Sequence, residues 1–187
     1  MLRLDHVTFS YGAEEPVVRD FSLEIPQGSR VCLTGPSGQG KTTVLRLLLG
    51  LEAPRQGTVS VPAGTRFSAV FQEDRLLPWK TTLENAALFS DEATARRILT
   101  ELRLGDSLDA LPETLSGGMK RRAALGRALA HPFDVLVLDE ALTGLDDVTK
   151  ARCLAVIDRA AGTRTLVMAS HDPAEAQALR ARPAAVT

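Results

Sequence analysis

The chain has 187 residues, of which 44% are hydrophobic and 24% charged, and this length and composition indicate one folded domain and exclude a disordered chain. The 22 lysines and arginines are balanced by 23 aspartates and glutamates, so the net charge of -1 excludes a broadly basic surface for nucleic acid or anionic lipid. Two cysteines are too few for a disulfide framework, and no apolar run is long enough to cross a bilayer. Charged residues interrupt the first segment too early for a signal peptide, so we expect a chain that stays in a reducing cytoplasm and does not itself enter a membrane.

The first part of the chain alternates short runs of β-forming residues with turns rich in glycine and proline. Its first three runs indicate a small sheet. The third run leads into a glycine-rich loop and then into an apolar helix over 42–49, which Gly50 closes. The strands predicted in this part are 2–9, 21–25, 30–33, 58–61 and 67–71.

Helical patterns predominate in the middle of the chain and then give way to two fully apolar strands separated by a helix. This alternation indicates buried parallel strands flanked by helices. The predicted helices are 82–104, in two segments broken near Ser90, 116–130 and 149–161, and the predicted strands are 135–138 and 165–169.

A glycine-rich segment between a predicted strand and a predicted helix matches the phosphate-binding loop pattern GxxxxGK[ST]. Its glycines let successive backbone N–H groups face a phosphate, and the start of the following helix adds partial positive charge. Lys41 would neutralise β- and γ-phosphate oxygens, and the Thr42 hydroxyl would bind Mg²⁺. The alternative is a glycine-rich turn that happens to carry Lys-Thr. The predicted nucleotide-binding residues of this segment are Gly35, Pro36, Ser37, Gly38, Gln39, Gly40, Lys41, Thr42 and Thr43.

Polar residues follow both apolar strands of the second half, at the strand ends where ligands of open α/β sheets bind. We expect Asp139 to hold Mg²⁺ and Glu140 to polarise the water that attacks the γ-phosphate. A neutral His171 would hydrogen-bond the γ-phosphate or that water. The alternatives are a solvated strand end or helix cap for the two carboxylates and a structural role for the lone histidine.

A second anion site is predicted at the start of the helix over 116–130, because Ser116, Gly117 and Gly118 leave hydroxyl and N–H donors free there. One nucleotide within a single compact domain does not account for two phosphate sites. The simplest explanation is a head-to-tail homodimer in which each copy completes the ATP site of the other.

The phosphate loop, the motif Leu115-Ser116-Gly117-Gly118, the pair Asp139-Glu140 and His171, in this order, resemble the ATPase subunit of ABC (ATP-binding cassette) transporters. The resemblance implies an α/β P-loop NTPase fold, with a mostly parallel central sheet, a small N-terminal antiparallel β portion and a helical insertion. We therefore expect a single ABC ATPase domain over 1–187, with its core in 1–77 and 131–187 and a helical subdomain over about 78–130.

The resemblance also assigns roles to three further residues. Tyr11 stands where the family stacks an aromatic ring on adenine, with a cap of the first turn as the alternative. Gln72 resembles the glutamine of the family's Q-loop, which contacts Mg²⁺ and links the nucleotide to the membrane partner. Asp146 resembles the aspartate of the D-loop at the dimer interface.

The segment 71–80, together with Met119 and Lys120, is similar to importers of nitrate, taurine and aliphatic sulfonates, a subgroup that includes transporters of thiamine precursors. This similarity implies that Leu76, Leu77 and Trp79 contribute to a groove for a coupling helix of the membrane subunit; packing within the helical subdomain is the alternative. The basic run from Lys120 to Arg122 would help to place the partner's nucleotide, but for Arg121 a solvated helix face is the preferred interpretation.

These features predict an enzyme that couples ATP hydrolysis to the import of a small solute, with ATP and Mg²⁺ as cofactors. Its predicted partners are a second copy of the chain, transmembrane permease subunits and, indirectly, a periplasmic or extracellular solute-binding protein, without nucleic acid. Its predicted place is the cytoplasmic face of the cell membrane.

Two departures from the family pattern favour a different class of function. Few residues follow His171, and Ala141 replaces the proline that often follows the catalytic glutamate. They suggest an ATP-binding regulatory or assembly module with little turnover as the alternative, although the intact Lys41, Asp139, Glu140 and His171 argue against it. A soluble ABC ATPase acting on nucleic acid or ribosomes ranks last, because the sequence has no coiled-coil insertion, paired cassette or basic face.

Overall fold

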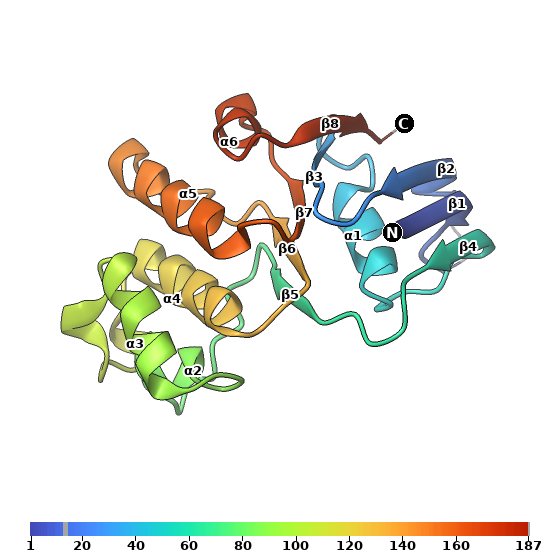
Figure 1. The fold of residues 1–187 in the computed structure, drawn as a ribbon. Helices are drawn as coiled ribbons and strands as arrows, with labels where there is room; N and C mark the ends of the chain where they lie inside the picture. Colours follow the sequence, from blue (N-terminus) through green and yellow to red (C-terminus); the bar gives the residue numbers. More distant parts are fainter. Residues whose placement is uncertain (13–14, 187) are drawn as a thin grey trace.

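Two β-sheets carry the fold in the computed structural model, which describes residues 1–12 and 15–186 (Figure 1). The smaller sheet is antiparallel, in the order β2-β1-β4. The larger sheet is parallel throughout, in the order β5-β6-β7-β3-β8. The strands are β1 (Leu2–Phe9), β2 (Val18–Ile25), β3 (Arg30–Thr34), β4 (Gln56–Ser60), β5 (Phe67–Val70), β6 (Val135–Asp139), β7 (Thr165–Ala169) and β8 (Arg182–Ala185).

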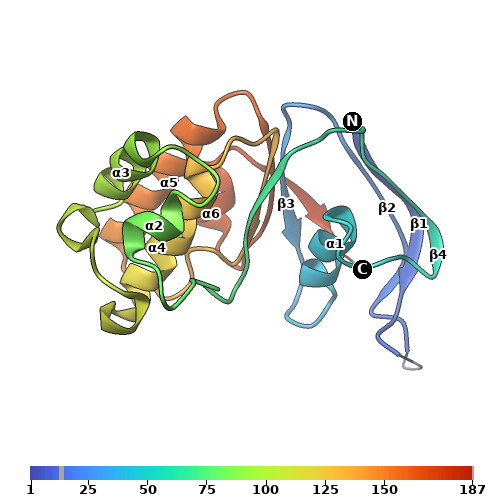
Figure 2. The same cartoon turned by 90° about the horizontal axis from the view of Figure 1, so that it is seen from below.

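Helices separate and cover the sheets. Helix α1 lies between the antiparallel sheet and the parallel sheet, and the other helices gather on the opposite side of the parallel sheet (Figure 2). Among the described residues, no helix has the length and apolar character needed to span a membrane. The helices are α1 (Lys41–Leu48), α2 (Thr82–Ala86), α3 (Glu92–Glu101), α4 (Gly117–Ala130), α5 (Asp147–Ala161) and α6 (Pro173–Ala178), with short 3₁₀ turns η1 (Gly105–Ser107) and η2 (Pro112–Thr114).

The parallel sheet is buried on both faces, which explains its uninterrupted apolar strands. Every residue of β6 and β7 is buried. Along β6, Val135 and Val137 belong to the core shared with α1 and the antiparallel sheet, whereas Leu136 and Leu138 belong to the core under the remaining helices. The period of two along the strand thus supplies side chains to two hydrophobic cores.

The predicted fold class is confirmed, and most predicted elements lie within a few residues of the observed ones. The assignment of 30–33 to the small N-terminal sheet is wrong: β3 pairs in parallel with β7 and β8, because Val31 and Leu33 are fully buried between layers. The sequence analysis missed α6 and β8. Strand β8 contains Pro183, which a sheet tolerates at its edge and which masks the strand pattern.

The contact between α3 and α4 provides a test of the packing, because a Cβ at Gly126 would lie 2.7 Å from Cδ2 of Leu99, which is fully buried. We expect Gly126→Ala to destabilise the fold by a net amount of about 1–3 kcal/mol, because the cost of overpacking exceeds the helix-propensity gain of about 1 kcal/mol. Leu99→Ala should cost about 2–5 kcal/mol. The double variant should cost less than the sum, because the new methyl group enters the space that Leu99 leaves. Urea unfolding of the four proteins measures this coupling, and strict additivity would contradict it.

Candidate nucleotide-binding site

The loop between β3 and α1 is curled around the side chain of its own lysine. Lys41 is buried, and its Nζ donates hydrogen bonds to the carbonyls of Gly35 at 2.7 Å and Pro36 at 2.9 Å. Gly40 has a φ of 82°, and a Cβ there would lie 2.9 Å from the carbonyl oxygen of Val17. Only glycine fits this position, so the loop holds its N–H groups and the start of α1 ready for an anion.

A cavity of about 390 Å³ opens over this loop. Its walls come from the phosphate loop, from the segment after β5 and from the ends of β6 and β7. Val17 also lines it, and sequence reasoning missed this residue because a lone valine in a turn carries no binding signal. The predicted residues gathered around the cavity are Ser37, Gly38, Gly40, Lys41, Thr42, Thr43, Gln72, Glu140 and His171.

Asp139, the last residue of β6, lies buried behind the loop. Burial raises the pKa of its carboxyl group, although a hydrogen bond from Thr42 acts in the opposite direction. The carboxyl and hydroxyl groups predicted to hold Mg²⁺ are therefore neighbours, in a pocket where a bound cation would stabilise the ionised carboxylate.

Glu140 and His171 face each other across the ends of neighbouring strands. The Nε2 of His171 lies 2.8 Å from Oε1 of Glu140. The backbone of Glu140 has a φ of 49°, a left-handed conformation that is rare for a non-glycine residue, and its N–H donates to the carbonyl of Ala169 at the end of β7. This turn aims the Glu140 side chain into the cavity that His171 also lines.

Two predicted ligands lie at the margins of this cavity. The hydroxyl of Tyr11 is 3.2 Å from Oγ1 of Thr43, and its ring meets Phe9 edge-on with centroids 4.9 Å apart. The ring is 38% exposed, so adenine stacking stays a prediction. The amide oxygen of Gln39 lies over Gly35, only 2.6 Å from where a Cβ would stand.

The Leu-Ser-Gly-Gly motif and Asp146 lie outside this cavity. Ser116 caps α4 by accepting a hydrogen bond from the N–H of Met119 at 3.3 Å, and Asp146 caps α5 in the same way with Thr149 at 2.9 Å. A Cβ on Gly118 would lie 3.4 Å from Cδ2 of Leu145, so the motif adjoins the D-loop segment. Within one copy of the chain, the two predicted phosphate sites therefore lie apart.

The structure bears on the alternative interpretations of Arg121 and of the segment that contains Leu76 and Trp79. The solvated-face interpretation of Arg121 is wrong: its side chain is only 14% exposed and binds the main chain of 71–72. Leu76 packs against the core under the helices, as the packing alternative expects, whereas Trp79 is 72% exposed, and the groove for a coupling helix stays a prediction.

The phosphate loop follows the parallel strand β3, and the acidic pair Asp139-Glu140 lies at the end of β6, with β7 between the two strands. This arrangement defines a P-loop nucleotide hydrolase. A family profile described as ABC transporter matches residues 18–143. The chain belongs to this family, as its resemblance predicts.

The most informative relatives are importer subunits and cassette dimers. The chain is 39% identical to the aliphatic sulfonates import ATP-binding protein SsuB 1 of Rhodococcus jostii, over 89% of this chain and 71% of that protein. It is 40% identical to SsuB of Pectobacterium atrosepticum, over 97% and 72% of the two chains. Among solved structures, the ATP-binding cassette MJ0796, a dimer bound to ADP and Pi in a post-hydrolysis state, superimposes with a TM-score of 0.86 at 26% identity, covering 95% of this chain and 91% of that one.

Asp139→Asn tests the electrostatics of this site. A carboxyl group whose pKa is raised on folding favours the folded state at low pH, and this contribution is lost as the pH rises through the raised value. Without nucleotide, we therefore expect the variant to be at least as stable as the wild type at neutral pH, with the difference shrinking at acidic pH, while ATP hydrolysis falls to background. Urea unfolding at both pH values measures the stability. A variant that unfolds more easily at neutral pH would contradict this assignment.

Proposed function

We propose that this chain is the ATP-hydrolysing subunit of an ABC importer whose solute is of the sulfonate, taurine, nitrate or thiamine-precursor type. One observation carries the proposal: Lys41, Thr42 and the Glu140–His171 pair line a single cavity, and the buried Asp139 lies behind it as the neighbour of Thr42. The names of the sulfonate-importer relatives support the direction of transport and the solute class.

The phosphate loop binds ATP through its backbone N–H groups and the start of α1. Lys41 exchanges its two loop carbonyls for β- and γ-phosphate oxygens, so its charge is satisfied with and without nucleotide. Tyr11 stacks on the adenine. Thr42, Asp139 and Gln72 would hold Mg²⁺, which would supply positive charge to the phosphate groups.

Glu140 accepts a proton from the attacking water, because its side chain lines the cavity in which the γ-phosphate would lie. Without nucleotide, the Nε2 of His171 holds that carboxylate; when nucleotide is bound, the same N–H donates to the γ-phosphate instead. The left-handed backbone at Glu140 fixes the direction of the base before substrate arrives.

Two copies of the chain enclose two ATP molecules head to tail. Each copy contributes Ser116, Gly117 and Gly118 to the partner's γ-phosphate, with Asp146 at the interface. Within one copy these residues lie away from the cavity, as such an arrangement requires. The dimeric cassette structures support this assembly.

The helical side of the molecule offers a surface for a permease. Trp79 and Phe89 are 72% and 68% exposed, unusual values for large hydrophobic side chains. Phe89 borders an apolar cavity of about 360 Å³ that Phe67, Arg127 and His131 also line. A helix of a transmembrane permease would fit there, which would place the subunit at the cytoplasmic face of the membrane, with a solute-binding protein reached only through the permease.

Glu140→Gln separates an ATPase from a regulatory module. The amide cannot accept the proton, so we expect nucleotide affinity to stay within about twofold while hydrolysis falls by about 10²- to 10⁴-fold. The variant should also accumulate an ATP-bound dimer, because opening follows hydrolysis. Steady-state ATPase rates and light scattering measure the two effects. Equal, slow turnover in both proteins at saturating ATP would favour the module with little turnover.

Mixing two inactive variants tests the shared sites. Lys41→Ala removes the phosphate lysine, and Ser116→Asp keeps the helix cap while placing a carboxylate against the partner's γ-phosphate. Each variant alone should be inactive. In an equal mixture about half of the dimers are mixed and each has one intact site, so about a quarter of the wild-type rate should return. A mixture no more active than its components, with both variants folded, would count against head-to-tail sharing.

A further inference from the structure

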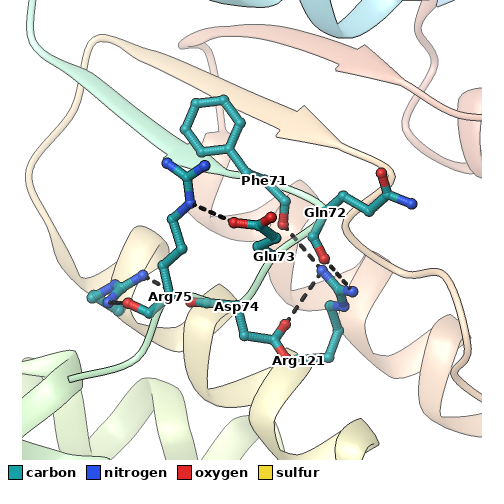
Figure 3. A network of polar contacts seen from close by, with 7 residues as sticks. Phe71, Gln72, Glu73, Asp74, Arg75 and Arg121 are labelled. Atoms are coloured by element: carbon teal, nitrogen blue, oxygen red, sulfur yellow. Dashed lines mark hydrogen bonds and ion pairs between the residues drawn. The ribbon is translucent and has the colours of Figure 1, made fainter. Parts of the chain in front are cut away.

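Two arginines of α4 hold the main chain of the Q-loop segment, which we define as residues 71–75 (Figure 3). Arg121 donates to the carbonyls of Phe71 at 3.0 Å and Gln72 at 2.7 Å. Arg127 donates to the carbonyls of Asp74 at 3.1 Å and Arg75 at 2.7 Å. This irregular segment thus depends on one helix for hydrogen-bond donors that strands or helices obtain from their own backbone.

Arg121 also faces the carboxylate of Asp74, with 3.3 Å between its Nη1 and Oδ1. Both side chains are largely buried, at 14% and 25% exposure. Among the described residues, Oδ1 of Asp74 is the one buried side-chain polar atom without a hydrogen-bond partner. The ion pair is therefore close but misaligned, and a small shift of the segment relative to α4 would complete its hydrogen bond.

Gln72 connects this contact to the nucleotide cavity. Its carbonyl is held by Arg121, while its side-chain amide points away from Arg121 in Figure 3 and lines the cavity over the phosphate loop. At the other end of the connection, α4 begins directly after Ser116, so Arg121 lies in the first turns of the helix that carries the Leu-Ser-Gly-Gly motif.

We propose that Arg121 is a positioning residue that makes Gln72 and the start of α4 move as one body. A contact of Gln72 with bound nucleotide then sets the orientation of the Leu-Ser-Gly-Gly motif, which serves the other ATP site of the dimer. Arg121 therefore couples the two sites. The inference rests on the proposed function, because it needs the head-to-tail dimer.

A planar fork is needed to reach two successive carbonyls and a carboxylate together, and lysine lacks it. In a Glu140→Gln background, Arg121→Lys should leave the nucleotide affinity of the dilute subunit within about twofold, since Arg121 does not touch the phosphate loop. The protein concentration for half-maximal ATP-dependent dimerisation should rise about tenfold. In an otherwise wild-type background, the Hill coefficient of ATP hydrolysis should fall toward 1. Fluorescent-nucleotide titration, light scattering and ATPase assays measure these three effects.

Arg30→Lys is the matched control. Arg30 is also 14% exposed, pairs with Asp158 and donates to two carbonyls, of Leu179 at 3.0 Å and Gly162 at 2.9 Å, but it touches neither α4 nor the Q-loop segment. Arg30→Lys should lower the melting temperature by about as much as Arg121→Lys does, while leaving ATP-dependent dimerisation and the Hill coefficient unchanged.

The outcomes separate the two proposals. If the Glu140→Gln parent dimerises with ATP and Arg121→Lys behaves like Arg30→Lys, the positioning role is overturned and the proposed function stands. If the parent binds ATP but does not dimerise, both fall. Arg121→Ala combined with Asp74→Asn provides a second variant without a buried unpaired carboxylate, and it should reproduce the Arg121→Lys defect.

Discussion

The register of the parallel sheet is the constraint on which the site depends. Strands β6 and β7 are buried on both faces, and their pairing places Asp139 opposite Ala169. Glu140 and His171 therefore leave the sheet at the same edge and meet. Strand β3 pairs with the other side of β7, with Leu33 opposite Ala169, so the phosphate loop emerges at that edge as well. If one of these strands slipped by one residue, each of its side chains would move to the opposite face of the sheet and into the other core, and these groups would be separated.

The packing that fixes the register also sustains unfavourable local features. Lys41 and Asp139 are buried charges, and Glu140 adopts a strained backbone. Each has a compensating contact: loop carbonyls for Lys41, Thr42 for Asp139 and the carbonyl of Ala169 for the Glu140 N–H. In the proposed mechanism, nucleotide and Mg²⁺ would supply stronger partners to Lys41 and Asp139, so binding would relieve a cost that folding has already imposed.

The sequence predicts those parts of the structure that local chemistry determines. Apolar runs identified β6 and β7, and the glycine-lysine pattern identified the phosphate loop, because each depends on a few consecutive residues. Strand β8 and the sheet membership of β3 depend on distant pairing and were missed or misassigned. The same limit applies to Arg121: an arginine in a basic run has the pattern of a solvated helix face, and only the position of 71–75 gives it carbonyls to bind.

Arginine forks join segments throughout this chain, but they differ in what they connect. Arg30 links β3 to the end of α5, and Arg122 links α4 to the carbonyls of Leu102 and Arg103, so neither holds a segment that lines the nucleotide cavity. Arg121 holds a segment whose other side lines the nucleotide cavity. A rigid contact between two segments couples two sites only if a ligand moves one of those segments. Position relative to the cavity, rather than any difference in bonding, therefore distinguishes the coupling arginine from the structural ones.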